Sequence, residues 1–596
     1  STPLIETLSA AALLLVGGCV NLPDPDLDAD TDGTDGTVGS DDDGGPGTGT
    51  SGADDESGSS GAGDCALIEQ ADVDDDLTLP AGCYVVELPL FAQDITLSME
   101  AGVDITFASG AGLTLSNAAV LTAVGSPDDP VVLHGESDDA ASWAGVSLVD
   151  APSSSNRLEN VVIDGAASVS VSANSRLTVV ASELTGSEEI GLEAVDGAEL
   201  SISGSTFSGH ERPLAVGISA APGVAADNVF SDNVDASVLV TGNSMTDAAT
   251  WAALAVPWEL DARVTLSATL TLEPGATVMV GQDNEIHVSP DGQLNAVGTA
   301  EAPITFTGVQ SEVGYWGGIE FASNSSNNVL EYAIVEYAGG VEWYGGGDAA
   351  SALYIPEEGR LTLRNSTIRY SEWYGLLTDD NAQIGEFVGN TFAESQRAMK
   401  IAPELCGTID GGTVFDEIAE PVVHIGVGGA QNVRTAQTWA ALSVPYRVTS
   451  NPVRVDADLT LEAGLVFEGA QDRELNVREG GTLHAAGTAE SPVVFTGIEN
   501  VAGYWKGIEF ESNSPDNLLE NTVVEYAGSS GWYGGADREA AIHVDAEALV
   551  ELDGVEIRDS AGNGILVNGS LTCSGATFAG IAKDNVSIDG GTGACS

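Results

Sequence analysis

Residues 314–340 read GYWGGIEFASNSSNNVLEYAIVEYAGG, and residues 503–529 read GYWKGIEFESNSPDNLLENTVVEYAGS. A catalytic site is usually needed once in a chain, whereas a structural unit can recur many times. The near-identity of the two stretches therefore indicates a repeated building unit. We expect Ile319 and Ile508 to point inward from short strands, and the Tyr-Trp pairs before them to pack at corners.

Repetition is visible on two scales. On the fine scale, Leu361, Ile384 and Gly407 begin similar segments 23 residues apart, and we expect a strand at each. On the coarse scale, TWAALAVPWEL at 250 returns as TWAALSVPYRV at 438, and LNAVGTAEAPITFTG at 294 returns as LHAAGTAESPVVFTG at 483. A fainter copy, LTAVGSPDDPVVLHG, starts at 121. Short alternating segments with a period near 23, punctuated by Gly and Asn, predict a β-solenoid.

The phrases LTLEPGATV, LNAVGTAEAPITFTG, YWGGIEF and VLEYAIVEYAG resemble those of right-handed parallel β-helix proteins of bacterial cell surfaces. Those proteins have the pectate-lyase-like fold and are often tethered as lipoproteins. The resemblance implies an all-β chain that forms a single-stranded right-handed parallel β-helix, and the composition of residues 20–64 adds a disordered acidic N-terminal linker. We expect one continuous solenoid in three blocks: block 1 at 65–249, block 2 at 250–437 and block 3 at 438–596. The same coil carries lyases, hydrolases and adhesins, so it does not specify a function.

The N-terminal 64 residues have a different composition. Residues 1–19 contain LSAAALLLVGGC, which resembles a signal peptide ending in a bacterial lipobox, with Cys19 as the lipidated residue. The segment before it departs from the pattern, because it has no basic residue and carries Glu6. Residues 20–64 are rich in Gly, Asp and Ser, lack aromatic and basic residues, and predict a disordered tether. The expected location is the outer membrane or surface of a bacterium, with secretion as the alternative.

The charge excludes one class of partner. The chain has 91 acidic and 18 basic residues, for a net charge of −73. Nucleic-acid binding relies on Lys and Arg neutralising phosphate, so we expect no nucleic-acid partner, and membrane contact only through the lipid anchor.

Asp28, Asp30 and Asp32 match the first half of a calcium loop, but Gly39 replaces its bidentate Glu. Weak Ca²⁺ binding and a plain acidic linker both stay open. No other cofactor is expected, and the oligomeric state is undetermined.

The remaining cysteines suggest how the solenoid ends. Cys65 and Cys83 flank the first coil, and Cys573 and Cys595 flank the last. We predict a disulfide in each pair. Each would fasten the last strand at one end of the solenoid, where an unpaired strand edge could otherwise pair with another chain. Cys406 is left over, and we expect it to be buried.

Three similar aromatic motifs are the strongest candidates for ligand contact. Flanking glycines would let their rings form a platform for a sugar ring or a hot spot for a protein partner. The alternative is an aromatic ladder that covers a loop insertion. The motifs are EWYGGG with Trp343 and Tyr344, EWYGLL with Trp373 and Tyr374, and GWYGGA with Trp532 and Tyr533.

Catalysis is the competing hypothesis. The sequence contains no HExxH, GxSxG or Walker A motif. β-Helix enzymes can assemble sites from neighbouring coils, and two acids on adjacent coils could serve a glycosidase. Candidate carboxylates are Asp348, Glu372, Asp379 and Asp380 in block 2, with Asp537 and Glu539 in block 3.

Two functions therefore remain in competition. One is a non-catalytic surface lipoprotein, a structural or adhesive β-helix that binds glycan or protein through its aromatic loops. The other is a polysaccharide hydrolase or lyase of the same fold. Repetition of blocks 2 and 3 favours the first, because a single active site would break the repeat.

Overall fold

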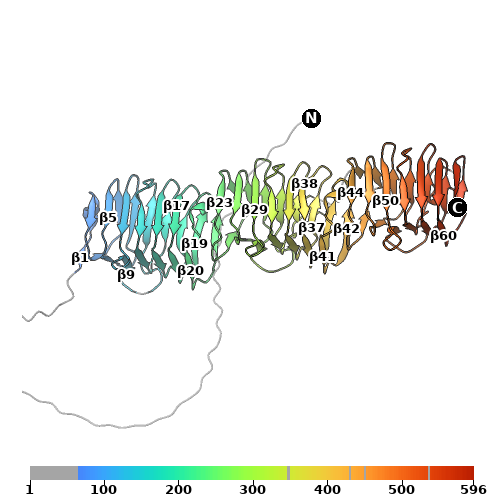
Figure 1. The fold of residues 1–596 in the computed structure, drawn as a ribbon. Coiled ribbons are helices and arrows are strands. Elements are labelled where there is room, and N and C mark those ends of the chain that lie inside the picture. The colour runs from blue at the N-terminus through green and yellow to red at the C-terminus, as the bar shows by residue number, and fades with distance from the viewer. Residues whose placement is uncertain are drawn as a thin grey trace, which may run out of the picture. The chain divides into compact units, whose positions relative to one another are not determined.

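The computed structural model describes residues 65–137, 139–344, 349–427, 431–448, 452–534 and 537–595. Asp64–Ser596 forms one compact unit, in which short strands stack coil upon coil (Figure 1). All ladders between the described strands are parallel, and Glu342 and Ala350 form an isolated antiparallel bridge. The predicted all-β parallel β-helix is therefore confirmed.

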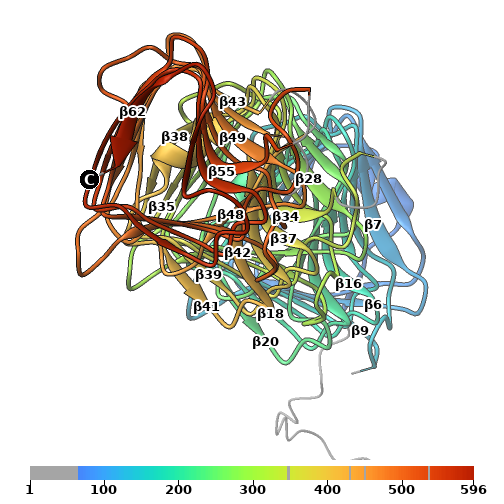
Figure 2. The same ribbon diagram turned by 90° about the vertical axis from the view of Figure 1, so that its right-hand side faces the viewer.

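Three sheets begin in the first coils of the described chain, and Figure 2 shows the coils from another side. Sheet 1 contains β1 (Ala66–Leu67), β3 (Gly82–Val86), β6 (Val103–Phe107), β9 (Val131–Gly135), β12 (Val161–Asp164), β15 (Glu183–Thr185), β18 (Thr206–Ser208) and β20 (Val229–Ser231). Sheet 2 contains β4 (Leu90–Gln93), β7 (Gly112–Ser116), β10 (Gly145–Val149), β13 (Val169–Val171), β16 (Ile190–Ala194), β19 (Arg212–Gly217), β21 (Val238–Thr241), β24 (Trp258–Leu260), β27 (Thr277–Val280), β30 (Ile304–Gly308), β33 (Ala333–Glu336), β36 (Thr367–Arg369), β39 (Thr391–Ala393) and β41 (Val414–Asp416). Sheet 3 contains β2 (Leu77–Leu79), β5 (Thr96–Met99), β8 (Val120–Val124), β11 (Arg157–Glu159), β14 (Arg176–Val180) and β17 (Glu199–Ser203).

Four further sheets begin later in the chain. Sheet 4 contains β22 (Ser244–Met245), β25 (Val264–Leu266), β28 (Glu285–Val288), β31 (Gly318–Phe321), β34 (Ser351–Ile355), β37 (Tyr374–Thr378), β40 (Arg397–Ile401), β42 (Glu420–Ile425), β45 (Tyr446–Val448), β48 (Val466–Gly469), β51 (Val493–Gly497), β54 (Thr522–Glu525), β57 (Glu556–Arg558) and β60 (Thr577–Ala579). Sheet 5 contains β23 (Ala249–Trp251), β26 (Thr269–Leu272), β29 (Gln293–Val297), β32 (Val329–Glu331), β35 (Arg360–Arg364) and β38 (Gln383–Val388). Sheet 6 contains β43 (Asn432–Val433), β46 (Val453–Val455), β49 (Glu474–Val477), β52 (Gly507–Phe510), β55 (Ala540–Val544), β58 (Asn563–Val567) and β61 (Val586–Ile588). Sheet 7 contains β44 (Gln437–Trp439), β47 (Asp458–Leu461), β50 (Thr482–Ala486), β53 (Leu518–Glu520), β56 (Leu549–Asp553), β59 (Ser570–Ser574) and β62 (Thr592–Cys595). The described helical segments are the 3-10 turns η1 (Gln70–Val73), η2 (Ala221–Gly223) and η3 (Pro403–Thr408).

The core is a set of inward rows that run from coil to coil. In sheet 4, Ile286, Ile319 and Leu353 are neighbours in register on successive strands, and all are buried. Ile319 and Ile508 are fully buried, as the repeat predicted. Because successive strand residues alternate sides, the polar residues between these apolar ones face outward. Burial of the inward rows removes apolar surface from water along the whole stack, and this burial stabilises the fold.

Each block anchors a corner with the same tryptophan. Trp143, Trp316 and Trp505 are buried, and their indole nitrogens donate to the main-chain oxygens of residues 164, 336 and 525 at 2.8, 2.8 and 2.7 Å. The expected corner packing of Trp316 and Trp505 is therefore present, and each buried N–H has a partner.

The blocks are rotated relative to one another around the coil. Strands β10, β31 and β52 follow the anchoring tryptophans of blocks 1, 2 and 3, and they belong to sheets 2, 4 and 6. Sheet 2 runs from block 1 into block 2, and sheet 4 runs from block 2 into block 3. Equivalent sequences in successive blocks therefore lie on different faces of the solenoid.

One expected strand is absent. The spacing predicted a strand starting at Gly407, but this residue lies in η3, and sheet 5 ends at β38. The segment begins with Pro403, which has no main-chain N–H to donate to a ladder. A 3-10 turn consequently replaces the third strand of this coil.

The two predicted disulfides are present. Cys65 bonds to Cys83 and ties β1 to β3, while Cys573 bonds to Cys595 and ties β59 to β62. Cys406 is a free, buried thiol, and burial raises its pKa well above the ordinary value. Each disulfide thus fastens an edge strand at one end of the stack.

Candidate functional site

Sheet 4 carries a row of side chains across successive coils that is polar or ionisable at every position except Leu377. Ladder pairing aligns each residue of this row with the next one along the stack. The row consists of His287, Glu320, Tyr354, Leu377, Lys400, His424, Arg447 and Glu468. We call it the sheet 4 row.

Glu420 is the centre of a charge cluster beside this row. Its Oε2 accepts a 2.8 Å hydrogen bond from Arg397 Nε, and its Oε1 accepts one of 2.8 Å from Arg447 Nη1. His424 Nε2 lies 3.6 Å from Oε2. Arg447 also donates through Nε to Glu468 at 2.5 Å. Four adjacent strands, β40, β42, β45 and β48, therefore supply one connected network.

The charges around Glu420 control its ionisation. Burial by itself would raise the pKa of this carboxyl, but the hydrogen bond from Arg397 and the nearby charges of His424, Arg397 and Arg447 outweigh it. The pKa of Glu420 is consequently below its ordinary value. The group is a stable carboxylate at neutral pH and holds the two guanidinium groups in place.

The second aromatic motif lies under the cations of this cluster. Tyr374 is buried at the start of β37, whereas Trp373 is half-buried just before it. The Arg397 guanidinium lies 5.3 Å from the centroid of each ring, and Lys400 Nζ lies 5.7 Å from that of Tyr374. His424 meets Tyr374 edge-on at 5.6 Å. These contacts combine cation–π attraction with edge-to-face packing.

The first aromatic motif packs on the preceding coil of sheet 4. Trp343 stacks on Tyr354 with centroids 5.5 Å apart, and Tyr344 meets the same ring at 5.9 Å. The Trp343 indole donates to Ser351 Oγ at 2.9 Å, and Tyr354 donates its hydroxyl to Asp379 at 2.8 Å. Burial, followed by this bond to Asp379, raises the pKa of Tyr354. Tyr344 remains 40% exposed.

The third motif is more deeply packed. Trp532 is 9% exposed, because His543 stacks on its ring with centroids 5.4 Å apart and Lys506 Nζ lies 4.3 Å from the ring centroid. Tyr533 donates to Asp589 at 2.9 Å and lies 3.9 Å from the Arg538 guanidinium. Because β34 and β55 belong to sheets 4 and 6, the first and third motifs lie on different faces. Ligand contact by the six motif residues stays a prediction.

The candidate carboxylates are divided between the two ends of a strand. Glu372 precedes β37, whereas Asp379 and Asp380 follow it. Five strand residues at about 3.3 Å each separate these ends by roughly 16 Å, more than the ~5–10 Å of a glycosidase pair. The structure therefore does not bring Glu372 and Asp379 together.

In block 3, the candidate acids share a cation. Lys583 Nζ contacts Asp537 at 3.0 Å and Glu539 at 2.5 Å. The hydrogen bond from Lys583 lowers the pKa of Glu539. The candidates Cys19, Asp28, Asp30, Asp32 and Asp348 lie outside the described residues.

Sequence reasoning missed the residues of the charge cluster. Tyr374, Arg397 and Glu420 are spaced 23 residues apart, and 23 residues is the coil period. Lys400, His424 and Arg447 are likewise separated by 24 and 23 residues. That spacing was the available signal, because residues one coil apart become neighbours in a parallel ladder.

In the described part of the chain, no three His, Cys, Asp or Glu side chains are grouped to hold a metal ion. Likewise, no described helix has the length and apolar composition needed to cross a membrane.

Comparison with known families supports the fold. Residues 224–353 and 433–544 match the family described as a pectate-lyase like beta helix domain. Both segments are β-helix of the pectate-lyase-like type. The matched segments start near the two block junctions and include β31 and β52, so the family covers the units that repeat. No curated protein and no solved structure matches the chain significantly.

Proposed function

We propose that this chain is a non-catalytic β-helix protein of a bacterial cell surface that binds glycan through sheet 4 of block 2. The aromatic cluster of Trp343, Tyr344 and Tyr354 provides the contact surface. An N-terminal lipid at Cys19 and the acidic segment 20–64 hold the β-helix off the membrane. The pectate-lyase-like fold supports the scaffold but does not specify the ligand.

The observation that carries this proposal is the exposure of Tyr344 on a rigid base. Tyr344 is 40% exposed, while the Tyr354 ring beneath it is 5% exposed and hydrogen-bonded to Asp379. A partly exposed ring supported by a stacked pair presents an apolar face with little loss of side-chain freedom. Rings of this kind suit the apolar faces of sugar units or an apolar group of a protein partner.

A polysaccharide-cleaving enzyme is the second candidate. Buried His424 lies beside Glu420 and Tyr374, with Lys400 on the same ring. Groups of titratable side chains with shifted pKa values are common at active sites, although structural ion networks also produce them. In this alternative, the charge cluster performs acid–base chemistry, and the Tyr344 surface positions the glycan chain.

A glycan array with the full chain tests the proposal, run in high salt with calcium and again with EDTA. Tyr344→Ala should abolish binding without changing thermal stability. Phe91→Ala is the control, because Phe91 is also an exposed aromatic residue, at 54% compared with 40% for Tyr344, and lies on the first strand of sheet 2. If glycan binding survives in Tyr344→Ala, the proposal that this surface binds glycan is rejected. Release of oligosaccharide that is lost in His424→Gln would establish the enzyme instead.

The anchor is tested separately. Cys19→Ala should abolish incorporation of a labelled fatty acid and release the chain from the membrane fraction of an expressing bacterium. Equal labelling of both chains would contradict lipidation at Cys19.

A further inference from the structure

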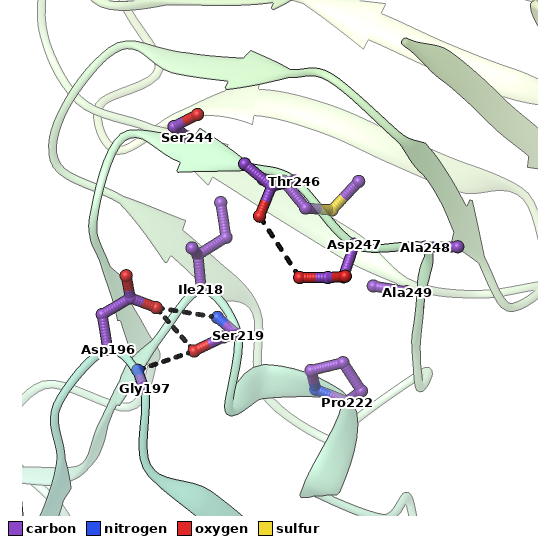
Figure 3. A pocket seen from close by; sticks show the side chains of 11 residues that line it. Asp196, Gly197, Ile218, Ser219, Pro222, Ser244, Thr246, Asp247, Ala248 and Ala249 are labelled. Atoms are coloured by element: carbon purple, nitrogen blue, oxygen red, sulfur yellow. Dashed lines mark hydrogen bonds between the residues drawn. The ribbon is translucent and has the colours of Figure 1, made fainter. Parts of the chain in front are cut away.

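The two junctions between blocks carry different charges at equivalent positions. The first junction joins blocks 1 and 2 and the second joins blocks 2 and 3, and each lies beside a copy of TWAAL, at 250 or 438. A cavity of about 390 Å³ lies at the first junction, lined in part by Asp196, Asp247 and Ala249 (Figure 3). Thr246, which also lines it, donates to Asp247 at 3.2 Å. No basic side chain is among the described residues that line this cavity.

Residues 432–510 repeat residues 244–321, and the later copy has cations where the earlier one has neutral residues. Ser244 pairs with Thr265 in the earlier copy. Asn432 pairs with Arg454 in the later one, so the register is the same. All the replacements lie on or directly beside the first four strands of sheet 6, β43, β46, β49 and β52. They are Thr246 by Arg434, Thr265 by Arg454, Asn284 by Arg473, Ser289 by Arg478 and Gly317 by Lys506.

Ladder pairing gathers the arginines of this set on one face. Arg454 lies in register between Asn432 of β43 and Asn476 of β49. Residues two apart along a strand point to the same side, so Arg434 and Arg478 lie on the side of Arg454. With strands about 4.8 Å apart, the Cα atoms of Arg434 and Arg478 are each roughly 8 Å from that of Arg454. We use the name sheet 6 arginines for Arg434, Arg454, Arg473 and Arg478.

Three of the sheet 6 arginines lack a carboxylate partner. In the part of the chain that the structure describes, Arg434, Arg454 and Arg473 form no ion pair. Unpaired arginines are unexpected in a chain in which 91 acidic residues face 18 basic ones. Arg434 and Arg473 are exposed, and Arg454 is half-buried. Their positive charge is therefore available to an anion from solution.

The carboxylates on the same strands are already engaged. Asp456 accepts a hydrogen bond from Asn432 at 2.6 Å and lies 3.6 Å from Arg478. Glu474 pairs with Lys506 at 2.5 Å. Exposed charges farther away than about 8 Å are largely screened at physiological ionic strength. The net charge of −73 therefore does not cancel the local attraction of the sheet 6 arginines for an anion.

We propose that the sheet 6 arginines are a binding site for an acidic oligosaccharide, separate from the sheet 4 surface. Guanidinium groups bind planar carboxylates and phosphate-like anions through paired hydrogen bonds. Arginines on three successive strands meet the carboxylates or sulfates of neighbouring sugar units. A nucleic acid is disfavoured, because DNA-binding proteins use about six to ten phosphate contacts and this face offers fewer cations.

The acidic segment 20–64 is the competing occupant. It holds 13 acids and no base, and it joins the solenoid at Cys65. Sheet 2 alone has 14 strands from β4 to β41, which at about 4.8 Å each extend roughly 62 Å before β43 is reached. A Gly-rich chain as long as residues 20–64 has a root-mean-square span of only about 37 Å. The same segment of a second copy is opposed by the net charge of both chains.

The test introduces the residues of the earlier copy. A triple variant built in this way should fold, because residues 244–321 form the same strands. It combines Arg434→Thr, Arg454→Thr and Arg473→Asn. The matched control removes three arginines that pair with glutamates and have side chains 38–54% exposed: Arg157→Thr, Arg176→Thr and Arg263→Asn. Both variants change the net charge equally, so a difference between them reports the site and not the total charge.

The probes share one backbone and differ in charge. They are maltotetraose oxidised to carboxylates at C6, maltotetraose sulfate and plain maltotetraose, with a peptide of residues 20–64 as the acidic protein comparator. Titration calorimetry with the full chain at low and high salt measures the affinities. At least one charged sugar should bind, more weakly at high salt. The triple variant should weaken that binding about tenfold or more, the effect of three exposed ion pairs, and the control should not.

Three results would overturn the proposal. They are no binding of either charged sugar, an equal loss of affinity in the triple variant and the control, and tighter binding of the peptide than of both charged sugars. The last result would assign this face to the acidic segment. Any binding of plain maltotetraose should be unchanged in the triple variant, and Tyr344→Ala should keep the binding of the charged sugars. Failure at sheet 6 is therefore distinguishable from failure of the sheet 4 surface.

Discussion

The indole of Trp532 stacks on the imidazole of His543, with ring centroids 5.4 Å apart and planes inclined by 19°. In block 2, Trp343 stacks on Tyr354 at 5.5 Å with an inclination of 21°. The two contacts are equivalent, because Tyr354 and His543 each follow a glutamate of the preceding coil, Glu320 or Glu509, in register. The motif thus has a packing role in both blocks, to which block 2 adds the exposed Tyr344.

Truncation should separate packing from surface exposure. Trp532→Ala should destabilise block 3 by about 3 kcal/mol, because it removes a large buried side chain and its stacking contact with His543. Tyr344→Ala should cost less than about 1 kcal/mol, because the ring is largely at the surface. Hydrogen exchange of β55 and β34 amides measures both effects. Equal protection of β55 in wild type and Trp532→Ala would contradict the packing role.

Removal of the central carboxylate should weaken the charge cluster. Glu420→Gln should lower stability at neutral pH by about 2 kcal/mol, because the Arg397 and Arg447 guanidinium groups lose a charged acceptor. The measurement is denaturant unfolding of both chains at several pH values. The pKa of Glu420 is lowered from 4.5, so its stabilisation is present above pH 4.5 and disappears as pH falls through the lowered value. A difference between the chains that grows below pH 4.5 would contradict this assignment.

His210 should titrate below the usual histidine range. Burial lowers its pKa from 6.5, and the hydrogen bond from the ring to the Leu184 carbonyl opposes this only in part. Its Nδ1 accepts from the Ser187 main-chain N–H at 3.1 Å, so protonation of this nitrogen breaks a bond. Stability is therefore complete above pH 6.5 and falls as pH drops toward the lowered pKa. An NMR midpoint at or above 6.5 would refute the buried, neutral ring.

A glycine at the start of each repeated strand should be irreplaceable. Gly507 has φ of +122°, and a Cβ there would lie 2.2 Å from the Ala541 oxygen on the next coil. Gly507→Ala should cost more than about 2 kcal/mol, because both backbone strain and displacement of β55 are required. Gly534→Ala is the matched control, since a Cβ at that position meets nothing within 4 Å. Similar unfolding midpoints for the two variants would show that β52 and β55 are not packed as described.

The second junction should depend on its glutamine. Gln437→Ala removes the acceptor of the Trp439 indole and of the Gly407 main-chain N–H. Leaving these donors unpaired should cost about 1–3 kcal/mol. Thermal unfolding of Gln437→Ala and Gln437→Glu measures the effect, because the glutamate keeps an acceptor oxygen. If both variants unfold at the same temperature as the wild type, these hydrogen bonds contribute nothing to stability.

Parts of the site were predictable, and others were not. The sequence offered Trp343 and Trp373 as candidate ligand contacts because each stands in a Trp-Tyr-Gly motif, and ligand contact at either residue stays a prediction. It did not reveal the cluster of Arg397, Glu420 and Arg447, because ladder neighbours are one coil apart and that distance varies from 18 to 35 residues with each loop. Nor did it separate Glu372 from Asp379, whose closeness in sequence hides the strand between them.

The sequence by itself determined the parallel β-helix, the two terminal disulfides and the buried corner tryptophans. Each follows from local periodicity or from spacing within one coil, where the chain has few alternatives. Only the tertiary structure decided that the equivalent strands of successive blocks belong to different sheets. The strands that follow the corner tryptophans of blocks 1, 2 and 3 lie in sheets 2, 4 and 6. That rotation arises at the junctions, where η2 and η3 replace a strand and new sheets begin. The face on which each repeated motif lies, and the cavity beside Ala249, depend on how those coils stack, which no single repeat encodes.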